Sequence, residues 1–413
     1  MDIRGSGLAQ TGGGDALNPV DNPFSPGAGT RPPELVGRDD VLNDGNVLLE
    51  RLRARRAERS ILLTGLRGVG KTVLLNEIEH RARDDGHKTL FLEASEGASL
   101  AGLLAPQVRR LLFDLDRLGG AGNAVRRALG VLVSFIRSVH VEVGGATFGV
   151  DIEPERGSAD SGILEEDLTD LFVALANAAA ERKTVVVLLI DEMQYFGAKE
   201  LGAIIRATHR IQQLNLPFAL VGAGLPVLPG LTGDARSYAE RLFKFPIIGA
   251  LSRQESHRAI AEPIQDSNES IDGPALDEIF ARTQGYPYFL QEWGYQVWNS
   301  ADRSPITLQD VIRATERVTR RLDENFFRVR FDRLTPNEKR MLRAMAELGP
   351  GPHRTGDVAR MLGHDTSTKI SQVRRHLIDK GMIYSPTHGE LAFTVPLFDE
   401  FMKRALRRLD EAS

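Results

Sequence analysis

An eight-residue stretch at 65–72 combines three glycines with a lysine and a threonine, in the order Gly-Leu-Arg-Gly-Val-Gly-Lys-Thr. Four residues separate its first glycine from the Gly-Lys-Thr ending, which is the spacing of the phosphate-binding loop called Walker A. Glycines let the backbone approach an anion closely, so that successive N–H groups and the amino end of a following helix can bind phosphate oxygens. We predict that Lys71 reaches the β- and γ-phosphates of a nucleotide and that Thr72 binds Mg²⁺.

Two adjacent acids, Asp191 and Glu192, follow the apolar run Val-Val-Val-Leu-Leu-Ile at 185–190. A carboxylate at the end of a buried strand next to a phosphate loop can hold Mg²⁺ through water, and an adjacent glutamate can polarise the attacking water. We therefore predict Asp191 as the metal-side residue and Glu192 as the catalytic base of a Walker B motif. Gln194 is either a residue that orients water or senses the γ-phosphate, or an exposed polar residue at a helix start.

The elements that must position these residues alternate along the chain. Hydrophobic periodicity predicts helices at 41–59, 73–83, 100–118, 124–138, 164–182 and 201–214. Short apolar or β-branched runs predict strands at 60–64, 87–93, 185–190, 218–221 and 242–248. Strands that alternate with helices favour a three-layer α/β domain around a parallel sheet, and the run at 185–190 is apolar on both faces, as a central strand requires.

Composition separates this α/β core, residues 34–250, from the rest of the chain. Residues 1–33 contain seven glycines and five prolines with hardly any apolar periodicity, which predicts a disordered tail. Within the core, residues 139–152 alternate apolar and polar side chains around Gly144-Gly145, which predicts a hairpin. The acidic stretch that follows, 153–162, is predicted to be a mobile loop, so that the core carries an insertion near 139–162.

Two helical parts follow the core. Residues 251–333 lack strand patterns and form an expected helical lid, with helices at 252–264, 273–283, 288–300 and 307–327. Residues 334–413 have the pattern of a winged helix. Its three helices are expected at 336–348, 355–362 and 367–381, and its two strands at 382–384 and 391–395 around a turn at 387–389.

Taken in order, these motifs resemble AAA+ ATPases of the origin-recognition type and their STAND-like relatives. The resemblance spans residues 34–409, and the Walker motifs are its most specific part. Its other motifs are Leu-Val-Gly-Arg at 35–38, Tyr-Ala-Glu-Arg-Leu at 238–242, Gly-Tyr-Pro at 285–287 and the terminal winged helix. It implies a P-loop NTPase that binds ATP or ADP with Mg²⁺.

The resemblance also implies roles for individual residues. Val36 and Gly37 are similar to a segment that packs on adenine, and Pro287 is similar to the lid residue that closes over the base, although Gly285 and Pro287 could equally end a helix. Arg236 or Arg241 resembles the arginine that an ATP-dependent homo-oligomer supplies to a neighbour's γ-phosphate, with a solvated salt bridge as the alternative. The implied nucleotide contacts of the loop are Gly65, Gly68, Val69, Gly70, Lys71, Thr72 and Val73.

One departure from the family pattern concerns the end of the fourth strand. Relatives often place a polar residue there to sense the γ-phosphate, whereas residues 222–226 read Gly-Ala-Gly-Leu-Pro. Nor is there an evident lid arginine that could complete a second sensor. Nucleotide binding is therefore better supported than fast hydrolysis, and we expect a slow or partner-dependent ATPase.

Charge leaves the macromolecular partner open. The formal net charge is −4, but residues 151–170 contain eight acids and one base, whereas residues 336–413 carry thirteen Lys and Arg against ten Asp and Glu. Such a surplus is modest for a duplex-DNA binder, whose affinity comes largely from phosphate neutralisation. The candidate DNA contacts lie on the expected recognition helix: Lys369, Gln372, Arg374, Arg375 and His376.

Two classes of function follow from this. In the first, ATP binding and oligomerisation load or regulate a complex on DNA. In the second, the chain is a STAND-like switch in which nucleotide clamps the lid and winged helix shut, and ATP exchange frees them to recruit a protein partner. The absence of cysteine excludes thiolate catalysis and Cys-ligated metal sites. The longest apolar stretch, 218–231, contains Gly and Pro and is too short to span a bilayer, and the amino end lacks a secretory signal pattern, so we expect a cytoplasmic protein without membrane contact.

Overall fold

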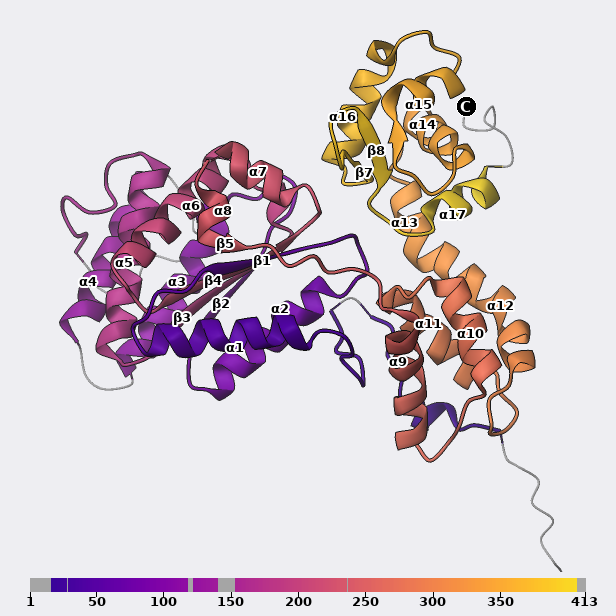
Figure 1. Cartoon of the computed structure of the whole chain (residues 1–413). Coiled ribbons are helices and arrows are strands. Elements are labelled where there is room, and N and C mark those ends of the chain that lie inside the picture. The colour runs from indigo at the N-terminus through magenta and orange to yellow at the C-terminus, as the bar shows by residue number, and fades with distance from the viewer. Residues whose placement is uncertain (1–15, 28, 118–121, 140–152, 236, 407–413) are drawn as a thin grey trace, which may run out of the picture. The chain divides into compact units, whose positions relative to one another are not determined.

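The computed structural model describes residues 16–27, 29–117, 122–139, 153–235 and 237–406. Contacts divide the chain into two compact units (Figure 1). The first unit joins residues 1–37 to residues 250–332, and the second joins residues 38–249 to residues 333–413. Each unit therefore contains segments that are distant in the sequence.

A parallel five-stranded sheet forms the centre of the second unit. Its order is β2-β3-β4-β1-β5, and each neighbouring pair is parallel. This confirms the predicted α/β fold, that of a P-loop NTPase. The last strand is shorter than predicted, because β5 ends at Lys244 before Pro246, which has no N–H to donate. The strands are β1 Ser60–Thr64, β2 Lys88–Glu93, β3 Val186–Asp191, β4 Phe218–Gly224 and β5 Phe243–Lys244.

Helices cover both faces of this sheet. Helices α1 and α2 contact one face, and α3 and α5 contact the other, with α4 and α6 packed on α5 (Figure 1). Among the helices that the structure describes, none is long and apolar enough to cross a membrane. The helices of this part are α1 Asp39–Arg53, α2 Lys71–Asp84, α3 Leu100–Arg117, α4 Asn123–Ser138, α5 Leu164–Glu181, α6 Ala198–Gln213, α7 Leu228–Ala235 and α8 Ala239–Leu242, and a 3-10 turn, η2, spans Met193–Tyr195.

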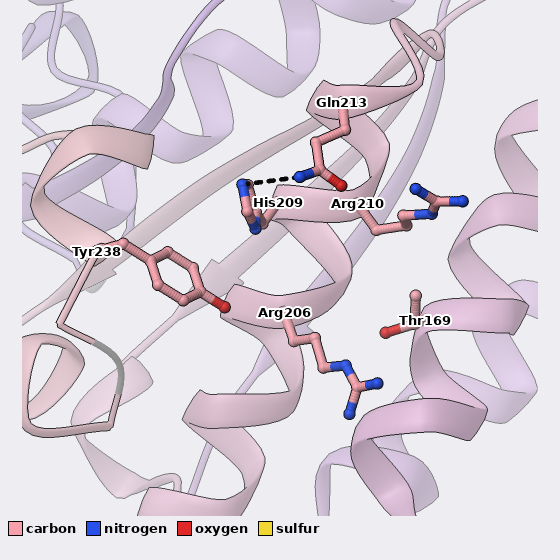
Figure 2. A pocket seen from close by; sticks show the side chains of 6 residues that line it. All are labelled: Thr169, Arg206, His209, Arg210, Gln213 and Tyr238. Carbon is pink, nitrogen blue, oxygen red and sulfur yellow. Dashed lines mark hydrogen bonds between the residues drawn. The ribbon is translucent and has the colours of Figure 1, made fainter.

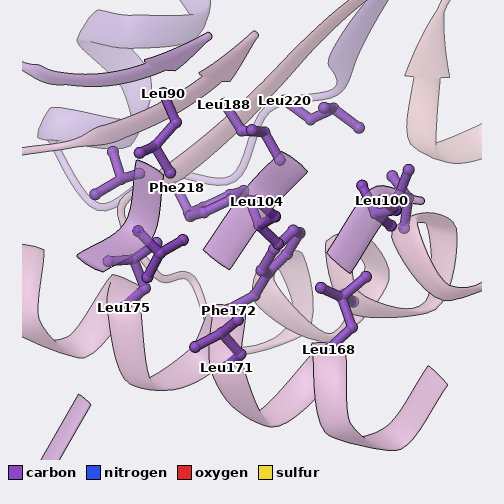
Figure 3. Close-up of a cluster of buried hydrophobic side chains, with 14 of the residues drawn as sticks. Leu90, Leu100, Leu104, Leu168, Leu171, Phe172, Leu175, Leu188, Phe218 and Leu220 are labelled. Atoms are coloured by element: carbon purple, nitrogen blue, oxygen red, sulfur yellow. The ribbon is translucent and has the colours of Figure 1, made fainter. Parts of the chain in front are cut away.

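The main hydrophobic core lies between the sheet and helices α3 to α6. Figure 3 shows leucines of β2, β3 and β4 facing Leu104 of α3 and Phe172 of α5. Phe172 also packs on Phe218 at the start of β4, with ring centroids 4.7 Å apart. Burying side chains on both faces of β3 fixes the strand, and with it the acids at its carboxyl end.

The acidic loop at 153–162 differs from our expectation of a mobile segment. The hydroxyl of Ser134 on α4 donates to the carbonyl of Glu155 at 2.7 Å, and Ala159 is buried. Asp167 on α5 accepts from the Ser161 amide at 2.9 Å and from the Gly162 amide at 3.1 Å. The acids therefore satisfy backbone donors that hold the loop. The predicted hairpin at 139–152 lies outside the described residues, apart from Val139.

Residues 333–406 complete the second unit and are called the C-terminal segment below. They include a three-stranded antiparallel sheet of order β6-β8-β7. The expected turn at 387–389 joins β7 to β8, whereas β6 and the last helix had no clear sequence signal. The elements are α14 Pro336–Glu347, β6 His353–Arg354, α15 Thr355–Met361, η4 Ser367–Ile370, α16 Ser371–Asp379, β7 Ile383–Tyr384, β8 Glu390–Phe393 and α17 Phe398–Ala405.

The first unit is helical, as expected for residues 251–333. The predicted single helix at 307–327 instead ends at Leu322 and continues as a π-helical turn, Asp323–Phe327. That turn buries Phe326 and Phe327 against Phe289, with ring centroids 5.4 and 6.0 Å apart. The helices are α9 Arg253–Asp266, α10 Gly273–Thr283, α11 Pro287–Trp298, α12 Leu308–Leu322 and α13 Arg328–Phe331, and a 3-10 turn, η1, spans Pro19–Asp21.

The prediction that all of residues 1–33 are disordered is wrong for their second half. Phe24 is 1% exposed, and its ring occupies the space that a side chain at Gly294 of α11 would need. The indole N–H of Trp298 donates to the carbonyl of Asn18 at 2.9 Å. Burial of this one aromatic side chain against α11 therefore stabilises a segment whose Gly- and Pro-rich composition predicts disorder.

Candidate nucleotide site

The glycine loop at 65–72 joins β1 to α2, as the motif requires. A Cβ on Gly65 would lie 2.2 Å from the carbonyl oxygen of Ile248, so no side chain fits there. Gly68 and Gly70 have φ of +80° and +94°, a region that glycine adopts readily. The Val69 side chain is buried beneath the loop, and Val73 continues α2. The sequence therefore folds into a loop shaped for close approach of an anion.

Lys71, the first residue of α2, is buried at the base of this loop. Its Nζ donates to the carbonyl oxygens of Gly65 and Leu66 at 2.9 and 2.8 Å. Burial lowers the pKa of Lys71 to about 8, against the opposing charges of Glu192 and Asp191. The ammonium is thus desolvated inside the loop, where a phosphate would be a stronger acceptor than two carbonyls.

We expect ATP binding to raise the pKa of Lys71 again, because the phosphate charge favours the ammonium form. The site should therefore take up nearly one proton per nucleotide at about pH 9 and almost none at about pH 7. Calorimetry in buffers of different ionisation enthalpy measures this uptake. An uptake that does not change with pH would contradict the placement of the phosphates at Lys71.

Thr72 and Asp191 bring two oxygen ligands together. The Thr72 hydroxyl donates to Oδ2 of Asp191 at 2.5 Å, across from α2 to the end of β3. Burial raises the pKa of the Asp191 carboxyl, and the hydrogen bond from Thr72 opposes that shift. Mg²⁺ is commonly bound by one or two protein oxygens together with phosphates and water. This pair fits Mg²⁺, and the metal-binding roles of both residues stay predictions.

Glu192 lies directly after β3 in a left-handed conformation, with φ of +53°. Its Oε1 is 3.3 Å from Nη1 of Arg67, and its Oε2 accepts a hydrogen bond from the side-chain amide (Nε2) of Gln194. Glu192 thus lies beside the glycine loop, where its role as the base stays a prediction, and its ion pair with Arg67 was not predicted. The only sequence signal for it is a charged residue at a variable position of the glycine loop.

The side chain of Gln194 lies at the end of β4, a strand that ends without a polar side chain of its own. Its Oε1 accepts from the amide of Leu225 at 3.0 Å. A Cβ on Gly224 would lie 2.9 Å from that same oxygen, so the glycine leaves the space that Gln194 fills. The missing side chain of β4 is thus replaced by one from the 3-10 turn after β3. Of the two predicted alternatives for Gln194, this position excludes the exposed helix-start residue.

Three expected nucleotide-binding residues belong to the first unit, whereas the glycine loop belongs to the second. Val36 is buried, and the carboxylate of Glu255 lies against Gly37, whose φ is +68°. Pro287 is the first residue of α11, where its lack of an N–H is tolerated. Their contact with adenine stays a prediction.

The two candidate trans-acting arginines are Arg236 and Arg241, and the structure describes only the second. Arg236 lies outside the described residues. Arg241 lies on the short helix α8 with its side chain exposed. An exposed guanidinium is accessible to a neighbouring molecule, but its role at another subunit's phosphate stays a prediction.

The candidate DNA contacts are divided between two elements, because the expected helix at 367–381 is a 3-10 turn, η4, followed by α16. Lys369 on η4 is exposed, and so are Gln372, Arg375 and His376 on α16. Arg374 is half-buried, and its Nε has no hydrogen-bond partner among the described residues. The four exposed side chains are available to a ligand, whereas Arg374 is less so.

A cavity of about 480 Å³ lies on α5 and α6 beside Tyr238 (Figure 2). His209 on α6 stacks against Tyr238, with ring centroids 4.8 Å apart. Arg206 also lines this cavity, but it already pairs with Glu165 and Glu166, each at 3.6 Å. None of the Walker residues lines it, so this cavity is separate from the nucleotide site.

Family models match two parts of the chain. Residues 34–221 match the family described as AAA ATPase domain, and residues 324–402 match a family described as a domain of unknown function, DUF8462. The AAA ATPase match contains both Walker motifs. Residues 34–221 are therefore similar to an AAA ATPase domain, whereas the second match covers most of the expected winged helix without assigning it a fold or role.

Relatives match over most of the chain at low identity. An uncharacterized HTH-type transcriptional regulator of Methanocaldococcus jannaschii is 24% identical over 86% of this chain and 85% of its own. A Walker-type ATPase of Pyrococcus abyssi has 15% identity and a TM-score of 0.59, covering 91% of this chain and 97% of that one. The RuvB Holliday junction branch migration motor of Thermotoga maritima has 17% identity and a TM-score of 0.43, covering 89% and 96%.

Proposed function

We propose that the protein is an ATP-hydrolysing AAA+ ATPase whose nucleotide state controls its assembly or the arrangement of its domains. The observation that carries this proposal is the position of Lys71, Thr72, Asp191 and Glu192. Asp191 and Glu192 lie at the carboxyl end of β3, and Lys71 and Thr72 begin α2 after the glycine loop that follows β1, so that all four surround one loop. A mononucleotide with Mg²⁺ is the ligand that needs all four groups.

Each residue has a distinct part in this chemistry. The glycine-loop amides and Lys71 bind the phosphates, and Thr72 and Asp191 hold Mg²⁺, which neutralises phosphate charge when bound. Glu192 accepts the proton of the attacking water. Because both oxygens of Glu192 already accept hydrogen bonds, from Arg67 and Gln194, we propose that basal hydrolysis is slow.

We also propose that the C-terminal segment is a winged helix that contacts duplex DNA. Its helices α14, α15 and α16, its antiparallel β7–β8 hairpin and the exposed residues of α16 support this proposal. A further support is the similarity, over 86% of this chain, to a relative named as an HTH-type transcriptional regulator.

A STAND-like switch that recruits a protein partner is the second candidate. One contact favours it, because the amide of Arg67 in the glycine loop donates to the carbonyl of Thr394 in the C-terminal segment at 3.0 Å. A segment that touches the phosphate loop can respond to the nucleotide without any contact with DNA.

The two candidates separate in one experiment, which measures particle mass with and without a non-hydrolysable ATP analogue and a short duplex. For the DNA-binding function we expect a complex at low salt that weakens with a logarithmic slope of roughly −3, since three cationic candidates each release about 0.9 counterion. Arg375→Ala should reduce that slope by about one. Arg110→Ala, on the exposed face of α3, is the control and should not change it.

The mass measurement also tests the first part of the proposal. A mass that rises with the analogue supports a nucleotide-dependent homo-oligomer. The absence of any duplex complex at low salt, with or without analogue, contradicts the DNA-binding function and leaves the protein-recruiting switch.

A further inference from the structure

We propose that Arg67 couples the C-terminal segment to the catalytic carboxylate, so that docking of the segment on the glycine loop holds Glu192 in a restrained state. The inference rests on the proposed ATPase function and concerns the regulation of the same site. It starts from Arg67 because three separate contacts meet at this one residue. Both parts that Arg67 joins belong to the second unit.

The first contact fixes the backbone of the glycine loop. The amide of Arg67 donates to the carbonyl of Thr394, directly after β8, at 3.0 Å. Thr394 is itself fully buried, and its hydroxyl donates to the carbonyl of Gly381 at 2.6 Å. Its amide donates to the carbonyl of Met382 at 3.1 Å. The acceptor of the Arg67 amide is therefore held rigidly by the turn that precedes β7.

The second contact places that same turn against the guanidinium. Gly381 has φ of +62°, and a Cβ there would lie 2.9 Å from Nη2 of Arg67 and 3.5 Å from the hydroxyl of Tyr195. A side chain in this position would push against the guanidinium. Gly381 thus lets the turn lie directly over Arg67, where it limits the directions in which the arginine can move.

The third contact reaches the proposed base. Nη2 of Arg67 donates to the Tyr195 hydroxyl at 3.0 Å, while Nη1 lies 3.3 Å from Oε1 of Glu192. Oε2 of Glu192 accepts from Gln194. Both bonds are strongest to the charged carboxylate, so they weaken when Glu192 accepts a proton from water and thereby oppose that step. Undocking of the C-terminal segment removes the restraint on Arg67 and makes that step easier.

The test is steady-state ATP hydrolysis by the full chain carrying Arg67→Ala. We expect kcat to rise on the order of tenfold, the lower end of what a hydrogen bond to a charged group contributes. In the Glu192→Gln background the same substitution should have no effect, because the restrained base is already absent. Arg110→Ala on α3 removes an exposed guanidinium and is expected to leave kcat unchanged.

A second readout separates coupling from a local change at the base. Hydrogen exchange of the amides at 381–394 should become faster in Arg67→Ala, because the guanidinium no longer supports the turn. Tyr195→Phe removes one acceptor of the guanidinium and should change both readouts in the same direction, but less. If Arg67→Ala does not fold, Arg67→Gln keeps most of the side-chain length and replaces it in both measurements.

The outcomes distinguish this inference from the proposed function. If the unmodified chain binds no ATP, both fail. If it binds and hydrolyses ATP but Arg67→Ala leaves kcat unchanged or lowers it, the coupling is wrong and the ATPase function stands. A rise in kcat with unchanged exchange at 381–394 also overturns the coupling, since Arg67 would then act on Glu192 independently of the C-terminal segment.

Discussion

Lys71→Ala is expected to weaken ATP binding by at least about 100-fold, which corresponds to about 2.7 kcal/mol. The reason is that the Lys71 ammonium is already desolvated inside the glycine loop, where a phosphate would meet a charge that water does not screen. Equilibrium binding of a fluorescent ATP analogue measures the change. A thermal melt of the variant without nucleotide shows whether the fold is retained.

The matched control is Lys403→Ala, since Lys403 is an exposed lysine on α17. Its affinity for ATP should equal that of the unmodified chain. An ATP affinity that is the same in Lys71→Ala as in this control would mean that nucleotide binds elsewhere, and the assignment of the glycine loop would then be wrong.

Glu192→Gln is expected to retain ATP binding while hydrolysis falls by about 100-fold or more, the range that general-base catalysis contributes. Glutamine has nearly the same shape as glutamate and still offers one oxygen to Arg67, but it cannot take a proton from water. Single-turnover hydrolysis at saturating ATP measures the chemical step. Nucleotide affinity should change by much less than the rate.

Glu316→Gln provides the comparison, because Glu316 is exposed on α12 and has no ion pair or hydrogen bond among the described residues. Its rate should match that of the unmodified chain. Equal single-turnover rates for the Glu192 variant and this control would show that Glu192 is not the base, even if binding is normal in both.

The nucleotide site could be predicted because its groups occur in short contiguous motifs. The glycine loop is eight residues long, and Asp191 and Glu192 directly follow their strand, so local spacing determines where the side chains go. β1 and β3 lie on either side of β4 in one parallel sheet, so their carboxyl ends bring the two motifs to the same edge. The parallel sheet itself follows from strands that alternate with helices.

The contacts that the sequence did not reveal join residues far apart in the chain. Thr394 meets Arg67 across more than three hundred residues, and no periodicity marks either partner. Phe24 is a similar case, because its ring is buried against Gly294 of α11, which lies far away in the sequence. The composition of a segment describes all its residues together, whereas burial of a single ring or formation of a single hydrogen bond can decide whether the segment is ordered.

The glycine at the end of β4 has a consequence for how this site can change. Gly224 and the side chain of Gln194 share one space, so a polar side chain added at 224 would meet Gln194 instead of open solvent. The effects of substitutions at the two positions on the free energy of unfolding should therefore be non-additive. Placing a polar side chain at position 224 requires a smaller side chain at position 194 at the same time. The two positions are thus one structural unit, and we expect a bulky change at either to be tolerated only with a compensating change at the other.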